Sequence, residues 1–430
     1  MDTATCDSRL AQDVSSFVRE GFTPNFGRAR AADRTAPLWR RLRELGTELW
    51  LDTGSIEDTR PLWTREFSAL TTNNTLLNRE VQKGAYDSLI PRAADLLRGH
   101  GLAGREMLLE IAFILNARHA LRLVEEFDAY VSVEEHTDLA HDAAAAVEVA
   151  RRCHAICPER FIVKIPLTPA GLLATRRVAG EGIPVNHTLG FSARQNFVAA
   201  RLARPEMANV FMGRLNAFVA DNDLGDGSLV GERATLASQR ILREVRARHD
   251  APTRQIGASF RSGEQVRDLA GLDIMTMPPK VARGFMELGV SPHDLADRTE
   301  EQYEPPLKRG VDAAEAGLHT LWDVSSKVRE CLDALEQEDV DSMQPVDLLA
   351  FFSAHGCGDL LVNWTDRQIA TSAAEGKIPK LANWADDLAS GRIGLDALMN
   401  LAGLNSFRAD QQAMDERISK VLQAEGMYES

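Results

Sequence analysis

Short apolar runs alternate with longer amphipathic runs between about residues 48 and 277. Solidly apolar or period-two runs are typical of strands, whereas apolar positions three and four residues apart are typical of helices. Eight segments have the strand pattern: 48–53, 67–73, 127–135, 160–167, 183–189, 209–215, 253–259 and 273–277. The chain therefore predicts a sheet of about eight strands.

Helical patterns separate these strands. We expect two helices within 76–124, followed by helices at 139–156, 169–182, 192–203, 231–250 and 263–272. Strands that alternate with helices and are apolar throughout favour a parallel sheet closed into a (β/α)8 TIM barrel over an open doubly wound sheet. No GxGxxG motif follows any of the predicted strands and no GxxxxGK[ST] motif occurs, so dinucleotide-binding and P-loop folds lose their usual support.

The pattern changes after about residue 290, where the chain becomes charged and proline-interrupted and then helical without strand signals. We expect three parts: an N-terminal arm and helix at 1–45, a catalytic α/β barrel at 46–292, and a helical C-terminal extension at 293–430. The apolar faces of the extension fit a homodimer, and they fit packing on its own barrel equally well.

Composition narrows the range of partners. The formal net charge is −14 and no stripe of Lys and Arg occurs, which disfavours nucleic acid and anionic membranes. The N-terminus does not resemble a signal peptide and no apolar stretch is long enough to span a bilayer, so we expect a cytoplasmic protein. Five scattered cysteines argue against a disulfide framework, and the Cys153–His154–Cys157 group has no second ligand pair, so we expect no metal site.

Polar residues gather where the predicted strands end, the edge at which barrel enzymes have their active sites. The ring contains two carboxylates, one amine and two guanidinium groups. Its members are Asp52, Thr71, Thr72, Asn73, Glu134, Lys164, Asn186, Thr188, Asn209, Arg214, Ser259 and Arg261.

Lys164 is the central candidate, because the chain has only eight lysines and this one lies in the apolar run FIVKIPL. Strand alternation points it into the barrel, where desolvation and nearby arginines disfavour the ammonium form. A neutral amine can attack a ketone and form a Schiff base, which accepts electrons when a neighbouring carbon–carbon bond is made or broken. The alternative is a structural lysine paired with Glu134 or Asp52.

The two carboxylates suit different proton transfers. Cleavage next to an iminium needs a base for the departing hydroxyl proton, and imine formation and hydrolysis need a second proton relay through water. Arg214, Ser259 and Arg261 are suited to holding a phosphate. The alternative is a structural role for these residues: each acid would be a helix cap or an ion-pair partner, and each arginine would form a salt bridge on the barrel rim.

Seven motifs, in order and on successive predicted strands, resemble the transaldolase family. They are LWLDTG, TTNNTL, SVEEHTDLAHD, FIVKIPLTPAGLLA, GIPVNHTLGFSARQ, FMGRL and GASFR, and the segment FRADQQAMDERISKVL, within 392–425, resembles the family's closing helix. The resemblance covers about residues 45–290. It implies a class I Schiff-base aldolase superfamily fold and sugar phosphate substrates, without a cofactor.

The resemblance also implies roles for individual residues. Lys164 matches the Schiff-base lysine, Asp52 the acid–base residue at the C4 hydroxyl, and Glu134 the carboxylate that acts through a catalytic water with Thr188. Phe211 and Glu134 stand where members that act as simple aldolases tend to carry Tyr and Gln, so transfer is favoured over free aldol cleavage. The residues that match substrate-binding positions are Thr71, Asn73, Asn186, Asn209, Phe211, Arg214, Ser259 and Arg261.

Two departures bear on the substrate. Asn74 stands where the family typically has Pro, and Asn209 replaces a serine commonly used to hold the donor's terminal hydroxyl. The leading hypothesis is a transaldolase of the pentose phosphate pathway that moves a dihydroxyacetone unit from sedoheptulose 7-phosphate or fructose 6-phosphate to an aldose phosphate. The alternatives are a related aldolase or transferase acting on an unusual sugar in specialised metabolism, and a barrel without catalysis.

Overall fold

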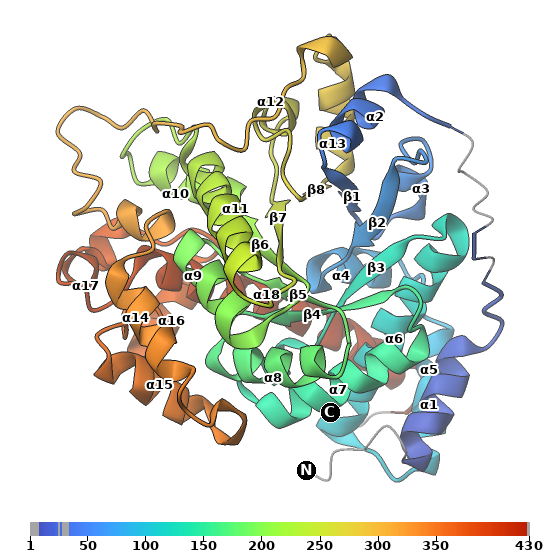
Figure 1. The fold of residues 1–430 in the computed structure, drawn as a ribbon. Coiled ribbons are helices and arrows are strands. Elements are labelled where there is room, and N and C mark those ends of the chain that lie inside the picture. The colour runs from blue at the N-terminus through green and yellow to red at the C-terminus, as the bar shows by residue number, and fades with distance from the viewer. Residues whose placement is uncertain (1–7, 25, 28–33, 428–430) are drawn as a thin grey trace.

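Eight parallel strands close into a barrel in chain order, with β1 paired to β8 (Figure 1). The computed structural model describes residues 8–24, 26–27 and 34–427. The predicted (β/α)8 fold is therefore confirmed. The strands are β1 (Glu48–Asp52), β2 (Phe67–Thr71), β3 (Tyr130–Glu134), β4 (Phe161–Pro166), β5 (Val185–Thr188), β6 (Met207–Phe211), β7 (Arg254–Ala258) and β8 (Ile274–Met277).

Large apolar side chains fill the barrel below its C-terminal edge. Trp50, Ile162, Met207, Ile256 and Ile274 form one buried cluster with two alanines, so the interior is a packed core. This packed layer is the floor beneath the polar groups that gather where the strands end.

Helices cover the outside of the barrel. Between residues 76 and 124 the structure has three helices where two were expected, because the turn around Gly84 and Tyr86 separates α4 from α5. The covering helices are α3 (Ile56–Thr59), α4 (Asn74–Gln82), α5 (Leu89–Gly99), α6 (Gly104–Phe127), η1 (Thr137–His141), α7 (Ala143–Ile156), α8 (Pro169–Gly180), α9 (Ala193–Val198), the π-helical turn η2 (Ala199–Ala203), α10 (Met212–Asp221), α11 (Val230–Arg248), α12 (Gly263–Asp268) and α13 (Pro279–Glu287).

The sixth predicted strand, 209–215, was wrong at its C-terminal end. β6 ends at Phe211 and Met212 begins α10, which places Arg214 in the first turn of a helix. A Cβ on Gly213 would lie 2.2 Å from the carbonyl oxygen of Ser259, so only glycine allows the helix to start this close to β7. The apolar run continues across this boundary, and periodicity cannot locate it.

Two N-terminal helices pack on the barrel, α1 (Arg9–Arg19) and α2 (Pro37–Glu44). Val14 and Val18 of α1 are buried in the core that α5, α6 and α7 share, and the Trp39 ring of α2 lies 5.2 Å from Phe67 and 5.0 Å from Phe285. Parts of the predicted N-terminal arm, residues 1–7, 25 and 28–33, lie outside the described residues.

Residues 328–361 of the C-terminal extension pack on the barrel's own helices α8, α9, η2 and α11 (Figure 1). It has helical elements and no strand within the described residues 293–427. They are η3 (Pro292–Asp294), η4 (Leu318–Leu321), α14 (Ser326–Leu335), η5 (Val340–Ser342), α15 (Pro345–Ala354), α16 (Asp366–Glu375), η6 (Leu381–Asn383), α17 (Ala385–Ala389) and α18 (Leu395–Ala424). The last of these, α18, contains the segment likened to a closing helix and reaches the C-terminal edge of the barrel, where it packs on α4.

Candidate active site

Lys164 projects from β4 into the barrel mouth and is only 3% exposed. Its Nζ donates a hydrogen bond to the carbonyl oxygen of Thr72 at 3.1 Å and lies 3.5 Å from Glu134 Oε1. In the strand register Glu134, Lys164 and Asn186 are direct neighbours on β3, β4 and β5. The ion pair fits both a reactive lysine and a structural one.

Asp52 stands at the end of β1 with part of its side chain exposed. The Thr71 hydroxyl lies 2.8 Å from Asp52 Oδ1 and 2.7 Å from the Thr276 hydroxyl, so Thr71 links β1, β2 and β8. Burial in the mouth raises the pKa of Asp52 above its ordinary value, while the positive charge of Lys164 opposes this rise. Asp52 is thus a carboxyl group that binds a proton more readily than a surface aspartate.

Glu134 is the second carboxyl group beside Lys164 and is 5% exposed. Burial raises its pKa; the Lys164 charge and a hydrogen bond from the Asn74 backbone N–H, 2.9 Å from Oε2, act in the opposite direction. Asp52 and Glu134 therefore differ in their partners, since one is bound by a hydroxyl and the other by an amide and an amine.

Three buried polar residues on β5 and β6 form a connected group. Asn209 Nδ2 donates to Asn186 Oδ1 at 3.3 Å and to Thr188 Oγ1 at 3.0 Å, and Asn186 Nδ2 donates to Ser132 Oγ at 3.1 Å. The larger residue at position 209 therefore holds the two neighbouring site residues directly. Asn73 forms no hydrogen bond with this group among the described residues; its Oδ1 caps α4 by accepting from the Leu76 N–H at 2.9 Å.

Arg214 is buried and lies between two aromatic rings. Its guanidinium carbon is 5.6 Å from the Phe211 ring centroid and 5.4 Å from that of Phe407. Burial and the nearby Arg261 lower the pKa of Arg214 to about 10, so it remains a cation at neutral pH. Its Nη1 is buried without a hydrogen-bond partner among the described residues, which leaves a donor for an anionic ligand.

Ser259 and Arg261 follow β7 and complete the basic end of the mouth. Ser259 has a φ of +64°, a left-handed conformation that bends the chain directly after the strand. Arg261 is exposed at the rim; partial desolvation of its guanidinium lowers its pKa, and the Asp52 charge opposes this. The Arg261 side chain lies against Gly213 in the first turn of α10. Arg214 and Arg261 are thus neighbours although they follow different strands.

Residues not named as site residues from the sequence also reach the mouth. Phe407 of α18 lies with its ring centroid 5.9 Å from Lys164 Nζ, and Asp410, one turn further on, accepts a hydrogen bond from the Thr75 hydroxyl. The segment FRADQQ drew attention to this helix, but no periodicity indicates which of its residues faces the lysine. The Thr72 carbonyl and the Asn74 N–H are backbone groups and carry no side-chain signal.

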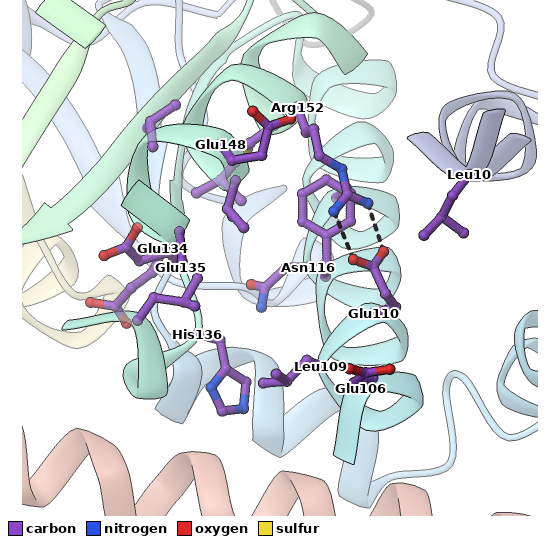
Figure 2. A pocket seen from close by; sticks show the side chains of 18 of the residues that line it. Leu10, Glu106, Leu109, Glu110, Asn116, Glu134, Glu135, His136, Glu148 and Arg152 are labelled. Carbon is purple, nitrogen blue, oxygen red and sulfur yellow. Dashed lines mark hydrogen bonds and ion pairs between the residues drawn. The ribbon is translucent and has the colours of Figure 1, made fainter. Parts of the chain in front are cut away.

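A separate cavity of about 190 Å³ lies behind β3 and β4, between α6 and α7, and Figure 2 shows its lining. Arg152 forms a two-pronged pair with Glu110 at 2.7 and 2.6 Å across it. Glu135, which follows Glu134, is 6% exposed, and both of its carboxyl oxygens are buried without a hydrogen-bond partner in the described chain. Burial, together with the Glu134 charge, raises the pKa of Glu135 to about 8.

Within the described residues no group of three His, Cys, Asp or Glu side chains is placed to hold a metal ion. Cys153 and Cys157 are buried in the core under α7, where burial raises the pKa of their thiols to about 12 and about 11. No described helix has both the length and the hydrophobicity needed to cross a bilayer.

The molecule thus has a lysine paired with a carboxylate, a second carboxyl group and two arginines, of which Arg214 is buried, at the strand ends of a closed barrel, the position of active sites in barrel enzymes. The chain belongs to the transaldolase/fructose-6-phosphate aldolase family, whose sequence model matches residues 49–344. It is therefore a member of an enzyme family, and the resemblance found from the strand-end motifs is confirmed.

Individual relatives agree with this family. The chain is 31% identical to the transaldolase of Xanthomonas euvesicatoria over 246 residues, which is 56% of this chain and 74% of that protein. It is 34% identical to a probable transaldolase of Thermus thermophilus over 254 residues, 58% of this chain and 93% of that protein. Each of these matches leaves more than two fifths of this chain uncovered.

Proposed function

We propose that this protein is a transaldolase that moves a dihydroxyacetone unit from a ketose phosphate to an aldose phosphate through a Schiff base on Lys164. The observation that carries the proposal is the buried Lys164 amine, 3.5 Å from the Glu134 carboxylate in the same mouth as Asp52. The expected substrates are sedoheptulose 7-phosphate or fructose 6-phosphate as donor, the site of action is the cytoplasm, and no cofactor takes part.

In the proposed reaction the Lys164 nitrogen attacks C2 of the ketose, and water leaves as the imine forms. Glu134, with Thr188 and a water molecule, transfers the protons that this dehydration and the later hydrolysis require. Asp52 takes the proton of the C4 hydroxyl, the C3–C4 bond breaks, and its electron pair moves into the enamine while the aldose phosphate departs. The enamine carbon C3 then forms a bond with the aldehyde carbon of a second aldose phosphate, and the aldehyde oxygen takes the proton from Asp52 and becomes a hydroxyl group. Hydrolysis of the resulting imine by water releases the new ketose phosphate and the free Lys164 amine.

The remaining polar residues would bind the two ends of the sugar. Thr71 orients Asp52, while Asn73, Asn186 and Asn209 would contact hydroxyl groups; the phosphate would lie between Arg214, Ser259 and Arg261. Phe211 packs against Phe191, with ring centroids 5.8 Å apart, and the two rings form an apolar wall beside this cationic end. With Phe211 and Glu134 in place, we expect transfer to exceed free aldol cleavage.

Borohydride trapping tests the proposal. Incubation with fructose 6-phosphate and reduction should add the mass of a reduced dihydroxyacetone or hexose phosphate adduct to the peptide that contains Lys164. Lys164→Arg should lose both the adduct and turnover while it keeps the fold, whereas Lys280→Arg, at an exposed lysine of α13, should retain both. An unchanged mass, or an adduct on another lysine, would refute the assignment.

A second candidate, a related transferase or lyase acting on an unusual sugar, is favoured by Asn209. Its amide already binds Asn186 and Thr188 and thereby fills space at the position of a smaller serine in the family. Assays with fructose 6-phosphate and erythrose 4-phosphate, beside a panel of phosphorylated and unphosphorylated ketoses, distinguish the two candidates. Poor turnover of the common pair together with efficient turnover of another ketose would favour the second.

A further inference from the structure

The loop between β2 and α4 contacts both members of the Lys164–Glu134 pair. The Thr72 carbonyl accepts from Lys164 Nζ at 3.1 Å, and two residues later the Asn74 N–H donates to Glu134 Oε2 at 2.9 Å. The Thr72 carbonyl thus faces the Lys164 amine, and the Asn74 N–H faces the Glu134 carboxylate. The loop itself is fixed to β3, because the Thr72 hydroxyl donates to the Ser132 carbonyl at 2.9 Å.

Asn74 suits this contact for reasons of local structure. It is the first residue of α4, where backbone N–H groups have no partner inside the helix, so its N–H is available to Glu134. It is fully buried, and its Nδ2 donates to the Glu135 carbonyl at 3.2 Å, which ties the start of α4 to the end of β3. Proline, typical of the family at this position, has no N–H and cannot donate to the glutamate.

We propose that Asn74 is a positioning residue that turns Glu134 toward Lys164 and stabilises its carboxylate through the backbone N–H. The expected effect on kcat rests on the proposed function. The hydrogen bond between the Asn74 N–H and Glu134 does not, because it is present in the unliganded protein. Asn74 touches neither the reacting amine nor the substrate in this role and acts through Glu134.

The charged surroundings of Glu134 determine the direction of the effect. Lys164 faces it from β4, Asp52 from β1 and Arg214 from α10, and Glu135 follows it in the chain. Burial raises the pKa of Glu134 and the Asp52 charge adds to this, whereas Lys164 and the Asn74 N–H oppose it. Removal of the N–H should therefore raise the pKa of Glu134 further, by about one pH unit or more for a charge-assisted hydrogen bond.

Two substitutions separate the backbone from the side chain. Asn74→Pro removes the N–H at a position where helices accept proline, and Asn74→Ala keeps the N–H but removes the bond to the Glu135 carbonyl. The first readout is the carbon NMR titration of the Glu134 carboxyl group in the unliganded, glutamate-labelled protein, assigned with Glu134→Gln. The second is the pH dependence of kcat.

In Asn74→Pro, the midpoint of the Glu134 titration and the midpoint of the acidic limb of the kcat–pH profile should both rise by about one pH unit. In Asn74→Ala, both midpoints should stay near their wild-type values. Equal midpoints in wild type and both variants would overturn the proposal. If Asn74→Pro does not fold, the Asn74 amide proton shift of the wild type takes its place. That shift should follow the titration of Glu134 and lose this dependence in Glu134→Gln; an amide shift without the dependence would also overturn the proposal.

The two proposals fail in distinguishable ways. A wild-type protein that forms no borohydride adduct at Lys164, yet has a Glu134 titration that depends on the Asn74 N–H, would refute the transaldolase function and support the positioning role. An adduct at Lys164, together with a Glu134 titration that does not change in Asn74→Pro, would support the transaldolase function and refute the positioning role.

Discussion

Replacement of Glu135 by glutamine should stabilise the protein at alkaline pH and leave its stability unchanged at acidic pH. The carboxyl group is 6% exposed and both of its oxygens lack hydrogen-bond partners among the described residues, so no described donor stabilises its charged form and bulk solvent screens it little. Burial and the charge of Glu134 raise its pKa from an ordinary 4.5 to about 8. Glutamine has nearly the same shape and cannot ionise.

The sign of the effect follows from proton linkage. Between the ordinary pKa and about 8 the folded protein holds a proton that the unfolded chain releases, so the free energy of unfolding falls as the pH rises through this range. At 1.36 kcal/mol per pKa unit, the loss by pH 9 is at most on the order of 5 kcal/mol, because relaxation around the charge reduces it. Below about pH 4.5 both states hold the proton and the loss vanishes.

Urea unfolding at intervals between pH 5 and pH 9 measures this loss. The difference in free energy of unfolding between Glu135→Gln and the wild type should grow steadily with pH and become level above about pH 8. Glu106→Gln is the matched control, because Glu106 lines the same cavity but is exposed. A difference that stays constant with pH, or that the control reproduces, would refute the linkage between burial of Glu135 and stability.

Two further predictions concern the C-terminal helix. Phe407→Leu removes one of the two rings around the Arg214 guanidinium, a contact of about 0.5–2 kcal/mol, so the affinity for inorganic phosphate measured by calorimetry should fall about twofold to thirtyfold. The control is Gln412→Ala, at an exposed position of the same helix. An unchanged affinity in Phe407→Leu would contradict this prediction. Asp396→Asn leaves the buried Arg194 with less compensating charge and should lower the free energy of unfolding by about 3 kcal/mol in urea. Asp333→Asn, at the 67% exposed partner of Arg201, should change it much less, and equal losses would show that burial does not decide the strength of these pairs.

Regular hydrophobic patterns made the barrel predictable from the sequence. Each of the eight strands lies at a predicted segment, because a strand covered by helices outside and side chains inside must be apolar along its length. The prediction was wrong where the apolar run did not change at an element boundary, as at Phe211 and Met212, and where a short turn near Tyr86 divides a continuous helical pattern.

The candidate site was predictable for a different reason. Parallel strands bring their C-terminal ends to one edge, so a list of strand-end residues is already a list of neighbours. The structure accordingly brings Glu134 within 3.5 Å of Lys164 although 30 positions separate them. Contacts from outside the strand pattern, such as Phe407 at 5.9 Å from the same amine, depend on how a later helix packs and have no local signal.

The packing of the extension accounts for the position of Phe407. Arg194 lies in the first turn of α9, the helix after β5, and binds Asp396 in the first turn of α18 with two nitrogens. Its third nitrogen binds Asp359 of the extension. The Asp359 carbonyl also accepts from the Gly394 N–H, just before α18 begins, at 2.8 Å. The extension therefore fixes the start of the helix that carries Phe407, and the barrel supplies the arginine that fixes the extension. Since Thr188 ends the strand that leads to Arg194, displacement of the extension would disturb β5 and the position of Phe407 together.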